Sequence, residues 1–306
     1  MSGPLTGLIP ACHTPFHSDG SLDLQTVPKQ ADLLREAGVR SVFIGGTTGE
    51  WSSLTIDERM KLTKSWVDAG GKSIQVAVHV GDNCQANAIA LAAQAKEAGA
   101  TAIAATTPSY FKPSSVDDLI DFCVPVAKAA GPLPFYFYDI PGMTGSRLPM
   151  GEFFKRARHK IPTLQGLKFS NDDLVELQEC IQLDEGNFDI LFGSDEVLLA
   201  ALALGVKGAV GNTYNFALPV YERVIKAFES NDLETARKEQ FKSIVLVKSL
   251  VEFGFLAASK CVWSFLGVEC GPVRPPVRNL TPAQKMELFD KLYNLDVFVK
   301  PLIRPY

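Results

Sequence analysis

A lysine, Lys168, stands inside the apolar run Leu164–Phe169. Moving an ammonium group out of water is costly, so the pKa of a buried lysine falls toward neutrality unless a carboxylate pairs with it. A neutral amine is a nucleophile and forms a Schiff base with a carbonyl compound. Two other interpretations stay open from this segment alone: the side chain reaches solvent at the end of the run, or it pairs with a structural carboxylate.

Two tyrosines lie in another apolar run, Phe135–Asp139. Side chains alternate between the two faces of a strand, so Tyr136 and Tyr138 share one face and the two phenylalanines share the other. The hydroxyl of Tyr138, near the end of the run, is a candidate proton relay. The alternative is that both tyrosines belong to the core and that their hydroxyls find hydrogen-bond partners there.

Glycines and hydroxyls are concentrated in the segment 45–50, Gly-Gly-Thr-Thr-Gly-Glu. Glycine lets the backbone approach a ligand closely, and the amides and hydroxyls of Thr47 and Thr48 can converge on an anion. We therefore expect a cradle for a carboxylate here; a plain turn rich in glycine is the alternative. A second polar segment holds Asp195 and Glu196, which are either acceptors for a polyhydroxylated substrate or acids that complement a helix dipole.

The elements that must position these residues are visible as eight short apolar runs. Most are continuously apolar, which is typical of strands buried on both faces. Segments with helical spacing lie between them, among them 24–37, 56–67, 86–98 and 116–129. This alternation predicts an α/β fold, a (β/α)8 TIM barrel, in which the chemistry lies at the carboxyl ends of the strands. The predicted strands are Leu5–Cys12, Val39–Gly45, Ile74–Val80, Thr101–Thr106, Leu133–Asp139, Leu164–Phe169, Phe188–Phe192 and Gly208–Thr213.

The ends of the predicted elements agree with this count. Thr55 and Glu58 form a capping box at the start of the second helix. An open nucleotide-binding sheet is disfavoured, because no glycine fingerprint follows the first strand. We expect the barrel to span residues 1–230 and a C-terminal helical extension, packed on the barrel, to span 231–306, with helices over 234–253, 257–266 and 282–292.

The composition limits the class of protein. Of the 306 residues, 46% are hydrophobic and 21% are charged, close to the averages of folded domains. The net charge of −4, from 30 Lys and Arg against 34 Asp and Glu, indicates no basic field for nucleic acid or for an anionic membrane. No apolar run reaches the length of a membrane helix and no secretory signal is visible, so we expect a cytoplasmic protein.

The spacing of the histidines and cysteines predicts no metal site. Metal ligands recur at short spacings, whereas the four histidines are dispersed: His13, His17, His79 and His159. No Cys-x-x-Cys pair is present, and disulfides are rare in the cytoplasm. We therefore expect buried free thiols at Cys12, Cys84, Cys123, Cys180, Cys261 and Cys270.

Six motifs, in order over about residues 5–215, resemble the pyruvate-dependent aldolase family of N-acetylneuraminate lyase and dihydrodipicolinate synthase. They are Thr14-Pro15-Phe16, the stretch 46–50, Pro108 with Tyr110, Tyr138-x-Ile-Pro, Gly166-Leu167-Lys168 and Gly211-x-Thr-Tyr-Asn. The resemblance implies that Lys168 forms a Schiff base with pyruvate, that Tyr138 relays protons, and that no metal or other cofactor takes part. It implies a small-molecule substrate bound by Thr47, Thr48, Ser170, Gly193, Asp195, Glu196, Asn212 and Tyr110. The family is typically tetrameric, so a homotetramer is expected, with Tyr110 at a subunit contact.

Within this family the subgroups differ at the second substrate. Dihydrodipicolinate synthases usually carry an arginine for a second carboxylate where this chain has Met143, although Arg147 follows four residues later. The segment 193–196 instead matches the pattern of sialic acid lyases. Asn212 stands where serine is common, and Asp139 replaces asparagine or histidine, which leaves the fine specificity open.

The resemblance therefore implies a lyase that reversibly cleaves N-acetylneuraminate to N-acetylmannosamine and pyruvate. Two alternatives remain. One is another pyruvate-dependent aldolase or hydratase of the family, acting on a shorter 2-keto-3-deoxy sugar acid or on aspartate semialdehyde. The other is a catalytically silent barrel that only binds its ligand.

Overall fold

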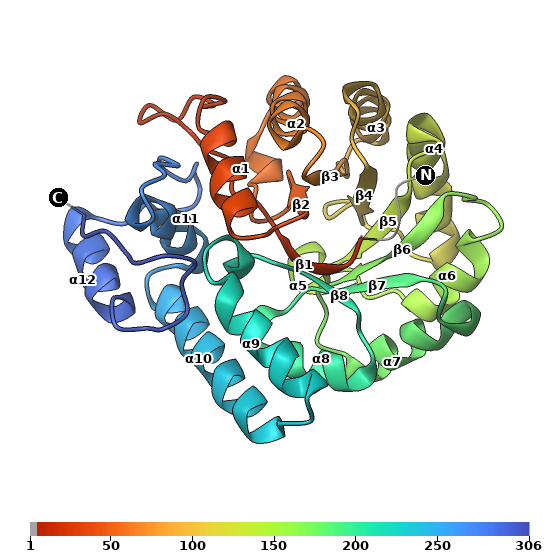
Figure 1. The fold of residues 1–306 in the computed structure, drawn as a ribbon. Coiled ribbons are helices and arrows are strands. Elements are labelled where there is room, and N and C mark those ends of the chain that lie inside the picture. Colours follow the sequence, from red (N-terminus) through yellow and green to blue (C-terminus); the bar gives the residue numbers. More distant parts are fainter. Residues whose placement is uncertain (1–4, 306) are drawn as a thin grey trace.

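The computed structural model describes residues 5–305. Eight parallel strands form a barrel at the centre of the molecule, and helices surround it (Figure 1). This arrangement confirms the predicted (β/α)8 barrel, and each predicted apolar run contains one strand. The strands are β1 (Gly7–Pro10), β2 (Ser41–Ile44), β3 (Gln75–His79), β4 (Ala102–Thr106), β5 (Phe135–Asp139), β6 (Leu164–Phe169), β7 (Asp189–Phe192) and β8 (Gly208–Gly211).

The barrel closes between β1 and β2. Each of the other neighbouring strands pairs in parallel register, in the order β1-β8-β7-β6-β5-β4-β3-β2. Beyond the end of β1, Ala11 forms a parallel bridge with Phe43 on β2, and the amide of Cys12 donates to the carbonyl of Phe43 at 2.9 Å. All eight carboxyl ends therefore face one mouth, where the predicted site residues belong.

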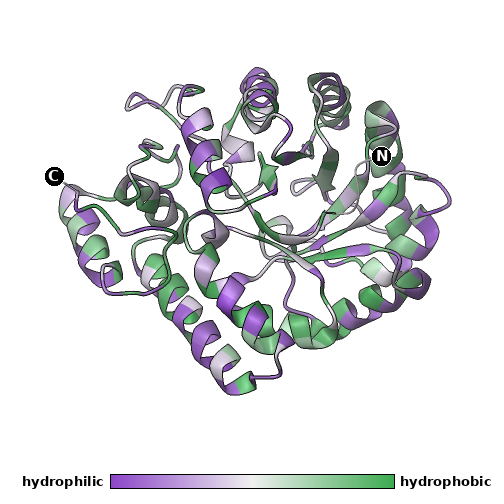
Figure 2. Cartoon of the chain, viewed as in Figure 1, coloured by the Kyte–Doolittle hydropathy of each residue, from purple (hydrophilic) through white to green (hydrophobic). Residues whose placement is uncertain are grey.

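The helices form the outer layer (Figure 2). The capping box of Thr55 and Glu58 is present at the start of α2, as predicted. Helices α10, α11 and α12 follow the last barrel unit: α10 packs against α9, and α11 and α12 pack against α10 and against each other (Figure 1). The helices are α1 (Val27–Glu36), α2 (Ile56–Gly70), α3 (Gln85–Ala98), α4 (Val116–Ala130), α5 (Pro141–Thr144), α6 (Met150–Ala157), α7 (Leu174–Gln182), α8 (Leu198–Leu204), α9 (Leu218–Glu229), α10 (Leu233–Glu252), α11 (Phe255–Phe265) and α12 (Pro282–Leu292).

The alternation of side chains along the strands separates two apolar cores. Tyr136 and Tyr138 point into the barrel and pack with a small inner cluster. Phe135 and Phe137 belong to the larger cluster between the barrel and the helices. The structure thus confirms that the two tyrosines share a face and that the phenylalanines share the other.

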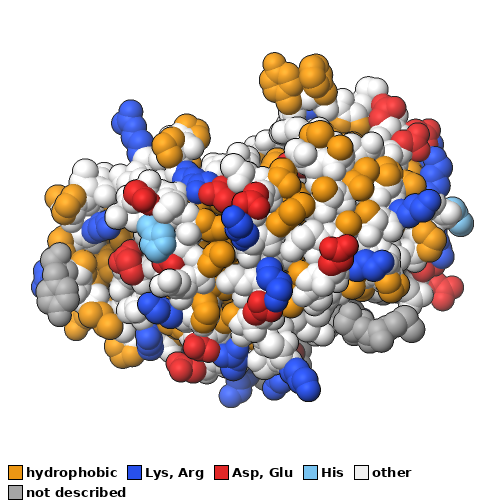
Figure 3. Space-filling view, turned by 90° about the horizontal axis from the view of Figure 1, so that it is seen from above, with side chains coloured by type: hydrophobic (Ala, Val, Ile, Leu, Met, Phe, Trp, Pro, Cys, Tyr) orange, Lys and Arg blue, Asp and Glu red, His pale blue; other side chains and the backbone are white. Residues whose placement is uncertain are grey.

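The surface and the unpaired cysteines agree with the expectations from the sequence, except for the burial of two thiols. Positive and negative side chains are interspersed on the face shown in Figure 3, and no helix within residues 5–305 is long and apolar enough to cross a membrane. All six cysteines are free, as expected. The expectation of burial is wrong for Cys84, which is exposed because it lies at the N-terminus of α3 rather than within an apolar element, and it holds only in part for Cys261, which is half-buried.

Candidate functional site

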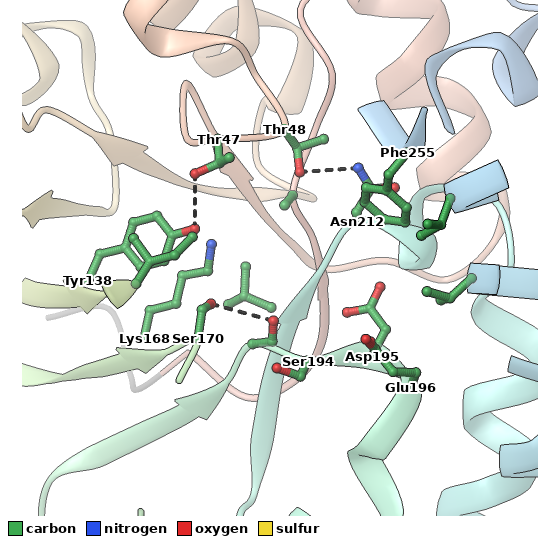
Figure 4. A pocket seen from close by; sticks show the side chains of 16 residues that line it. Thr47, Thr48, Tyr138, Lys168, Ser170, Ser194, Asp195, Glu196, Asn212 and Phe255 are labelled. Carbon is green, nitrogen blue, oxygen red and sulfur yellow. Dashed lines mark hydrogen bonds between the residues drawn. The ribbon is translucent and has the colours of Figure 1, made fainter. Parts of the chain in front are cut away.

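A cavity of about 300 Å³ opens at the carboxyl ends of the strands. Figure 4 shows its side chains, with Tyr138 and Thr47 on one side of Lys168 and with Asp195 and Glu196 on the other. Seven of the eight predicted substrate-binding residues and both predicted catalytic residues line it. The lining consists of Ala11, Thr47, Thr48, Tyr138, Ile140, Lys168, Ser170, Gly193, Ser194, Asp195, Glu196, Val210, Asn212, Val247, Val251 and Phe255.

Lys168 lies on β6 and is only 4% exposed. Its ammonium nitrogen stands 3.7 Å from the centre of the Tyr138 ring and 4.2 Å from that of Phe43. Within the described part of the chain, no carboxylate or carbonyl oxygen is at hydrogen-bonding or ion-pair distance from this nitrogen. The two alternatives left by the sequence are thereby excluded: the side chain neither reaches bulk solvent nor pairs with a structural carboxylate.

The two tyrosines of β5 have different surroundings. The hydroxyl of Tyr138 shares a hydrogen bond of 3.3 Å with the hydroxyl of Thr47, beside Lys168 (Figure 4). Tyr136 lies deeper in the barrel, and its hydroxyl donates to Asp189 Oδ2 at 2.6 Å. A proton relay at the pocket is therefore available to Tyr138, whereas Tyr136 has the buried, satisfied hydroxyl of a core tyrosine.

The turn 45–50 lies between β2 and α2 and carries both threonines of the predicted cradle. It is tightly packed: a Cβ atom on Gly49 would stand 3.0 Å from the backbone of Gly45, and the Thr14 hydroxyl donates to the Gly49 carbonyl at 2.6 Å. Glu50 ends the turn in the left-handed region, at a φ of 57°. Thr47 and Thr48 of this turn line the cavity, where an anion cradle would need their amides and hydroxyls.

Asp195 and Glu196 differ in what their carboxylates contact. Asp195 is buried, and its Oδ2 accepts from the amide of Thr213 at 2.7 Å and from its hydroxyl at 2.6 Å. Burial raises the pKa of Asp195 to about 6, and the nearby charge of Glu196 adds to the rise. Glu196 is half-buried and, among the described residues, its carboxylate has no hydrogen-bond partner. Of the two acids, Glu196 therefore has its carboxylate free for a ligand, whereas Asp195 also anchors the turn after β8.

Small and amide side chains complete the polar wall. Ser170 follows β6 and contacts the strand end of β7 so closely that a Cβ on Gly193 would lie 2.0 Å from the Ser170 hydroxyl. Asn212 follows β8, and its Nδ2 donates to the Thr48 hydroxyl at 3.2 Å (Figure 4). The asparagine that departs from the family pattern thus holds one threonine of the predicted cradle.

Two predicted or suspected residues lie away from the cavity. Tyr110 is 80% exposed and stacks edge-on against Phe111, which is 87% exposed, with ring centres 5.1 Å apart. Arg147 forms a surface ion pair with Asp172 at 3.5 Å and does not line the cavity. No arginine is among the described lining residues, so Arg147 does not supply the charge that a second substrate carboxylate would need there.

The sequence patterns did not indicate three residues that line the cavity, nor a second buried lysine. Val247 and Val251 on α10 and Phe255 at the start of α11 form an apolar wall of the cavity. Lys260 on α11 is a second buried lysine, paired with Glu50. The only sequence signal for this lysine was a charge in the otherwise apolar segment 255–265.

Metal ligands are not gathered near the cavity. Within the described residues, His, Cys, Asp and Glu do not form a group of three that could hold a metal ion. His13 and His79 are buried, and burial lowers the pKa of each well below its usual value. Trp263 Nε1 donates to His13 Nδ1 at 3.0 Å, and His79 Nδ1 lies 3.0 Å from the Gly45 carbonyl. Both are therefore buried, hydrogen-bonded core residues.

Comparison with known proteins agrees with this geometry. The model of the "Dihydrodipicolinate synthetase family" matches residues 4–294. The chain is 37% identical to N-acetylneuraminate lyase of Mus musculus, over 98% of this chain and 95% of the mouse protein. It is 41% identical to N-acetylneuraminate lyase of Gallus gallus, over 89% of this chain and 90% of that protein.

A solved structure shows the same fold. The structure of N-acetylneuraminate lyase from Proteus mirabilis superposes with a TM-score of 0.94 at 36% identity. The superposition covers 96% of this chain and 100% of the Proteus chain. The family model and the solved structure both match this chain over almost its full length. This chain is therefore a member of the dihydrodipicolinate synthetase family.

Proposed function

We propose that this protein is a lyase that reversibly cleaves N-acetylneuraminate to N-acetylmannosamine and pyruvate, through a Schiff base on Lys168. The observation that carries the proposal is the buried, unpaired amine of Lys168 at the floor of an open cavity, 3.7 Å from the Tyr138 ring. The relatives and the solved structure named above, all N-acetylneuraminate lyases, support the choice of substrate.

The proposed reaction uses groups that lie together in the cavity. The amine of Lys168 adds to the keto carbon C2 of the open-chain sugar acid, and loss of water forms the iminium ion. The C4 hydroxyl then loses its proton, the C3–C4 bond breaks, and its electron pair enters the iminium to form an enamine. N-acetylmannosamine leaves as the aldehyde. Protonation of the enamine at C3 and hydrolysis of the imine release pyruvate and restore the lysine.

Tyr138 relays the proton in this scheme. Its hydroxyl is bonded to Thr47 and stands beside Lys168, so it reaches the atoms next to the imine. The iminium nitrogen accepts the electrons of the broken bond, and for that reason the proposed reaction uses neither a metal nor another cofactor. The turn that carries Thr47 and Thr48 binds the substrate carboxylate through amides and hydroxyls.

The rest of the cavity favours a hydroxylated substrate over one with a second carboxylate. Glu196 presents a carboxylate that can accept hydrogen bonds from the glycerol tail of sialic acid. Ser170, Gly193 and Asn212 add small and polar side chains to the same cavity. Since Arg147 pairs with Asp172 outside the cavity, a dihydrodipicolinate synthase reaction on aspartate semialdehyde is the weaker candidate.

The proposal extends to assembly and location. The exposed pair Tyr110 and Phe111 presents two large aromatic rings to solvent, which is typical of a surface covered by another subunit. We expect a homotetramer with Tyr110 at a contact between subunits. Cytoplasmic location is the corresponding expectation for an enzyme of free sugar acids with thiols that are all unpaired.

Borohydride reduction tests the chemistry. Incubation with pyruvate and borohydride should add one reduced pyruvate to the chain, on the peptide that contains Lys168. The peptide with the buried, paired Lys260 serves as an internal control and should stay unmodified. Lys168→Ala should fold with no adduct and no activity, and the wild type should release N-acetylmannosamine from N-acetylneuraminate. An adduct without that product would favour another aldolase of the family, and no adduct would contradict the mechanism.

A further inference from the structure

A buried ion pair joins the proposed carboxylate cradle to the C-terminal helices. Lys260 Nζ on α11 lies 2.8 Å from Glu50 Oε1, and the two side chains are 1% and 2% exposed. The partners are 210 residues apart in the chain. A buried pair of this kind is weak evidence for stability, because the cost of removing two charges from water offsets most of their attraction. Because the pair lies at the end of the cradle, we looked to the binding site for its role.

The backbone at Glu50 supports such a role. Glu50 has a left-handed backbone conformation, with φ 57° and ψ 36°. This conformation is unfavourable for residues other than glycine, because their Cβ atom crowds the backbone. Its two carboxylate oxygens are held separately, Oε1 by Lys260 and Oε2 by the amide of Arg274 at 2.8 Å. These contacts of the side chain thus help to hold the backbone of Glu50 in the left-handed conformation. That geometry ends the turn in which Thr47 and Thr48 stand.

Lys260 is fully engaged, in contrast to Lys168. Besides Glu50, its Nζ donates to the Pro272 carbonyl at 2.6 Å and stands 4.1 Å from the centre of the Phe16 ring. The nearby carboxylate therefore keeps this amine as a structural cation although burial lowers its pKa. A nucleophilic role for Lys260 does not fit these contacts.

The same helix reaches the cradle by a second route. Trp263 and Ser259, on either side of Lys260, bond the two ring nitrogens of His13, at 3.0 and 2.9 Å. Asn212, whose Nδ2 lies 3.4 Å from His13 Nε2, donates to Thr48. Helix α11 is therefore linked to the turn 45–50 at two points: directly at Glu50, and at Thr48 through His13 and Asn212.

We infer that Lys260 and Glu50 are positioning residues of the substrate site, and that helix α11 holds the turn 45–50 in the shape that binds the carboxylate of the substrate. This inference rests on the proposed function. Neither residue touches the reacting atoms; both act through Thr47 and Thr48. Their loss should weaken the binding of ligands that carry a carboxylate and should leave the chemistry of the Lys168 amine intact.

Trapping with two ketones separates this role from a general effect on folding. Pyruvate carries the carboxylate, whereas acetone forms an imine with Lys168 without one. The double variant Glu50→Gln/Lys260→Met removes both charges at similar volume, so no charge is left buried alone. We expect the pyruvate concentration that half-saturates borohydride trapping to rise roughly tenfold to a hundredfold. The rate of trapping at saturating pyruvate and the rate of trapping with acetone should each change less than about threefold, which is small beside the expected loss of pyruvate affinity.

Two further variants complete the test. Glu50→Asp keeps the charge but shortens the side chain by one methylene, so it should fold and still lose pyruvate affinity. Ile120→Ala removes a buried side chain of α4 that does not line the cavity, so it should lower stability and leave the ratio of pyruvate to acetone trapping unchanged. If the double variant does not fold, the ratio of pyruvate to acetone trapping in Glu50→Asp tests the inference.

The outcomes are distinct. Wild-type affinity for pyruvate in the folded variants, or an equal loss with both ketones, would overturn the inference while the proposed function stands. No adduct at Lys168 in the wild type would overturn the proposed function and this inference together. A selective loss with pyruvate, matched by unchanged trapping of acetone, supports the positioning role.

Discussion

Tyr138 and Lys168 are register partners on the neighbouring strands β5 and β6, and the lysine amine lies 3.7 Å from the centre of the tyrosine ring. Parallel pairing places both residues at the same height in the barrel, with both side chains directed inward. The ring face stabilises a cation and the hydroxyl extends beyond it to Thr47. One aromatic side chain thus both contacts the amine and offers a hydroxyl to the substrate.

Tyr138→Phe separates these two contributions. The phenylalanine keeps the ring beside Lys168 and removes only the hydroxyl. We expect kcat for cleavage of N-acetylneuraminate to fall about 10²–10⁴-fold, the usual contribution of a positioned proton-transfer group. Borohydride trapping of pyruvate should continue on Lys168. Unchanged kcat, measured as release of N-acetylmannosamine, would exclude Tyr138 as the relay.

Thr48→Val tests the cradle. Valine has the shape of threonine but lacks the hydroxyl that binds the carboxylate, and a hydrogen bond to a charged group contributes about 1.5–3 kcal/mol. The KM for every pyruvate-containing substrate should therefore rise about tenfold to a hundredfold. Thr48→Ser keeps the hydroxyl and is the matched control. Equal kinetics of the valine and serine variants would mean that the hydroxyl takes no part.

Glu196→Gln and Asp195→Ala should fail in different ways. The glutamine weakens hydrogen bonds to the sugar tail, so kcat/KM should fall about tenfold to a hundredfold for N-acetylneuraminate. A short 2-keto-3-deoxy sugar acid without those hydroxyls should lose much less. Asp195→Ala leaves the amide and hydroxyl of Thr213 without their acceptor, so it should lower Tm and affect both substrates alike. Parallel losses in Glu196→Gln would contradict the assignment of the sugar tail to this acid.

Asp139 makes stability depend on pH. Burial raises the pKa of its carboxyl to about 7, and the nearby Glu176 adds to the rise while Asn171 opposes it through a hydrogen bond of 2.9 Å. The folded state therefore binds this proton more tightly than the unfolded state does. Its stabilising contribution is complete below the unfolded pKa, about 3.9, and is lost as the pH rises through 7.

Asp139→Asn tests this dependence, because the amide keeps an acceptor for Asn171 and cannot ionise. The variant should have a higher Tm than the wild type at pH 8, and the difference should shrink as the pH falls toward 4. Thermal unfolding over this range measures it. A difference in Tm that is constant with pH would show that Asp139 does not titrate in this window.

The local sequence determined the elements and the inward faces. Continuous apolar runs indicated the eight strands, and period-two alternation placed Tyr136 and Tyr138 on one face, because both patterns depend only on neighbours along the chain. Strand ends of a barrel converge on one mouth, and for that reason residues at the ends of five strands could be assigned to a common site from the sequence.

Only the tertiary structure decided which polar groups are free and which are engaged. Asp195 and Glu196 are adjacent in sequence and both line the cavity, yet the carboxylate of Asp195 is bonded to Thr213 and that of Glu196 has no partner among the described residues. Likewise, two buried lysines differ only in whether a carboxylate from a distant segment reaches them: Glu50 meets Lys260, and none meets Lys168 among the described residues. Such pairings depend on how elements far apart in the chain pack, and no local pattern encodes them.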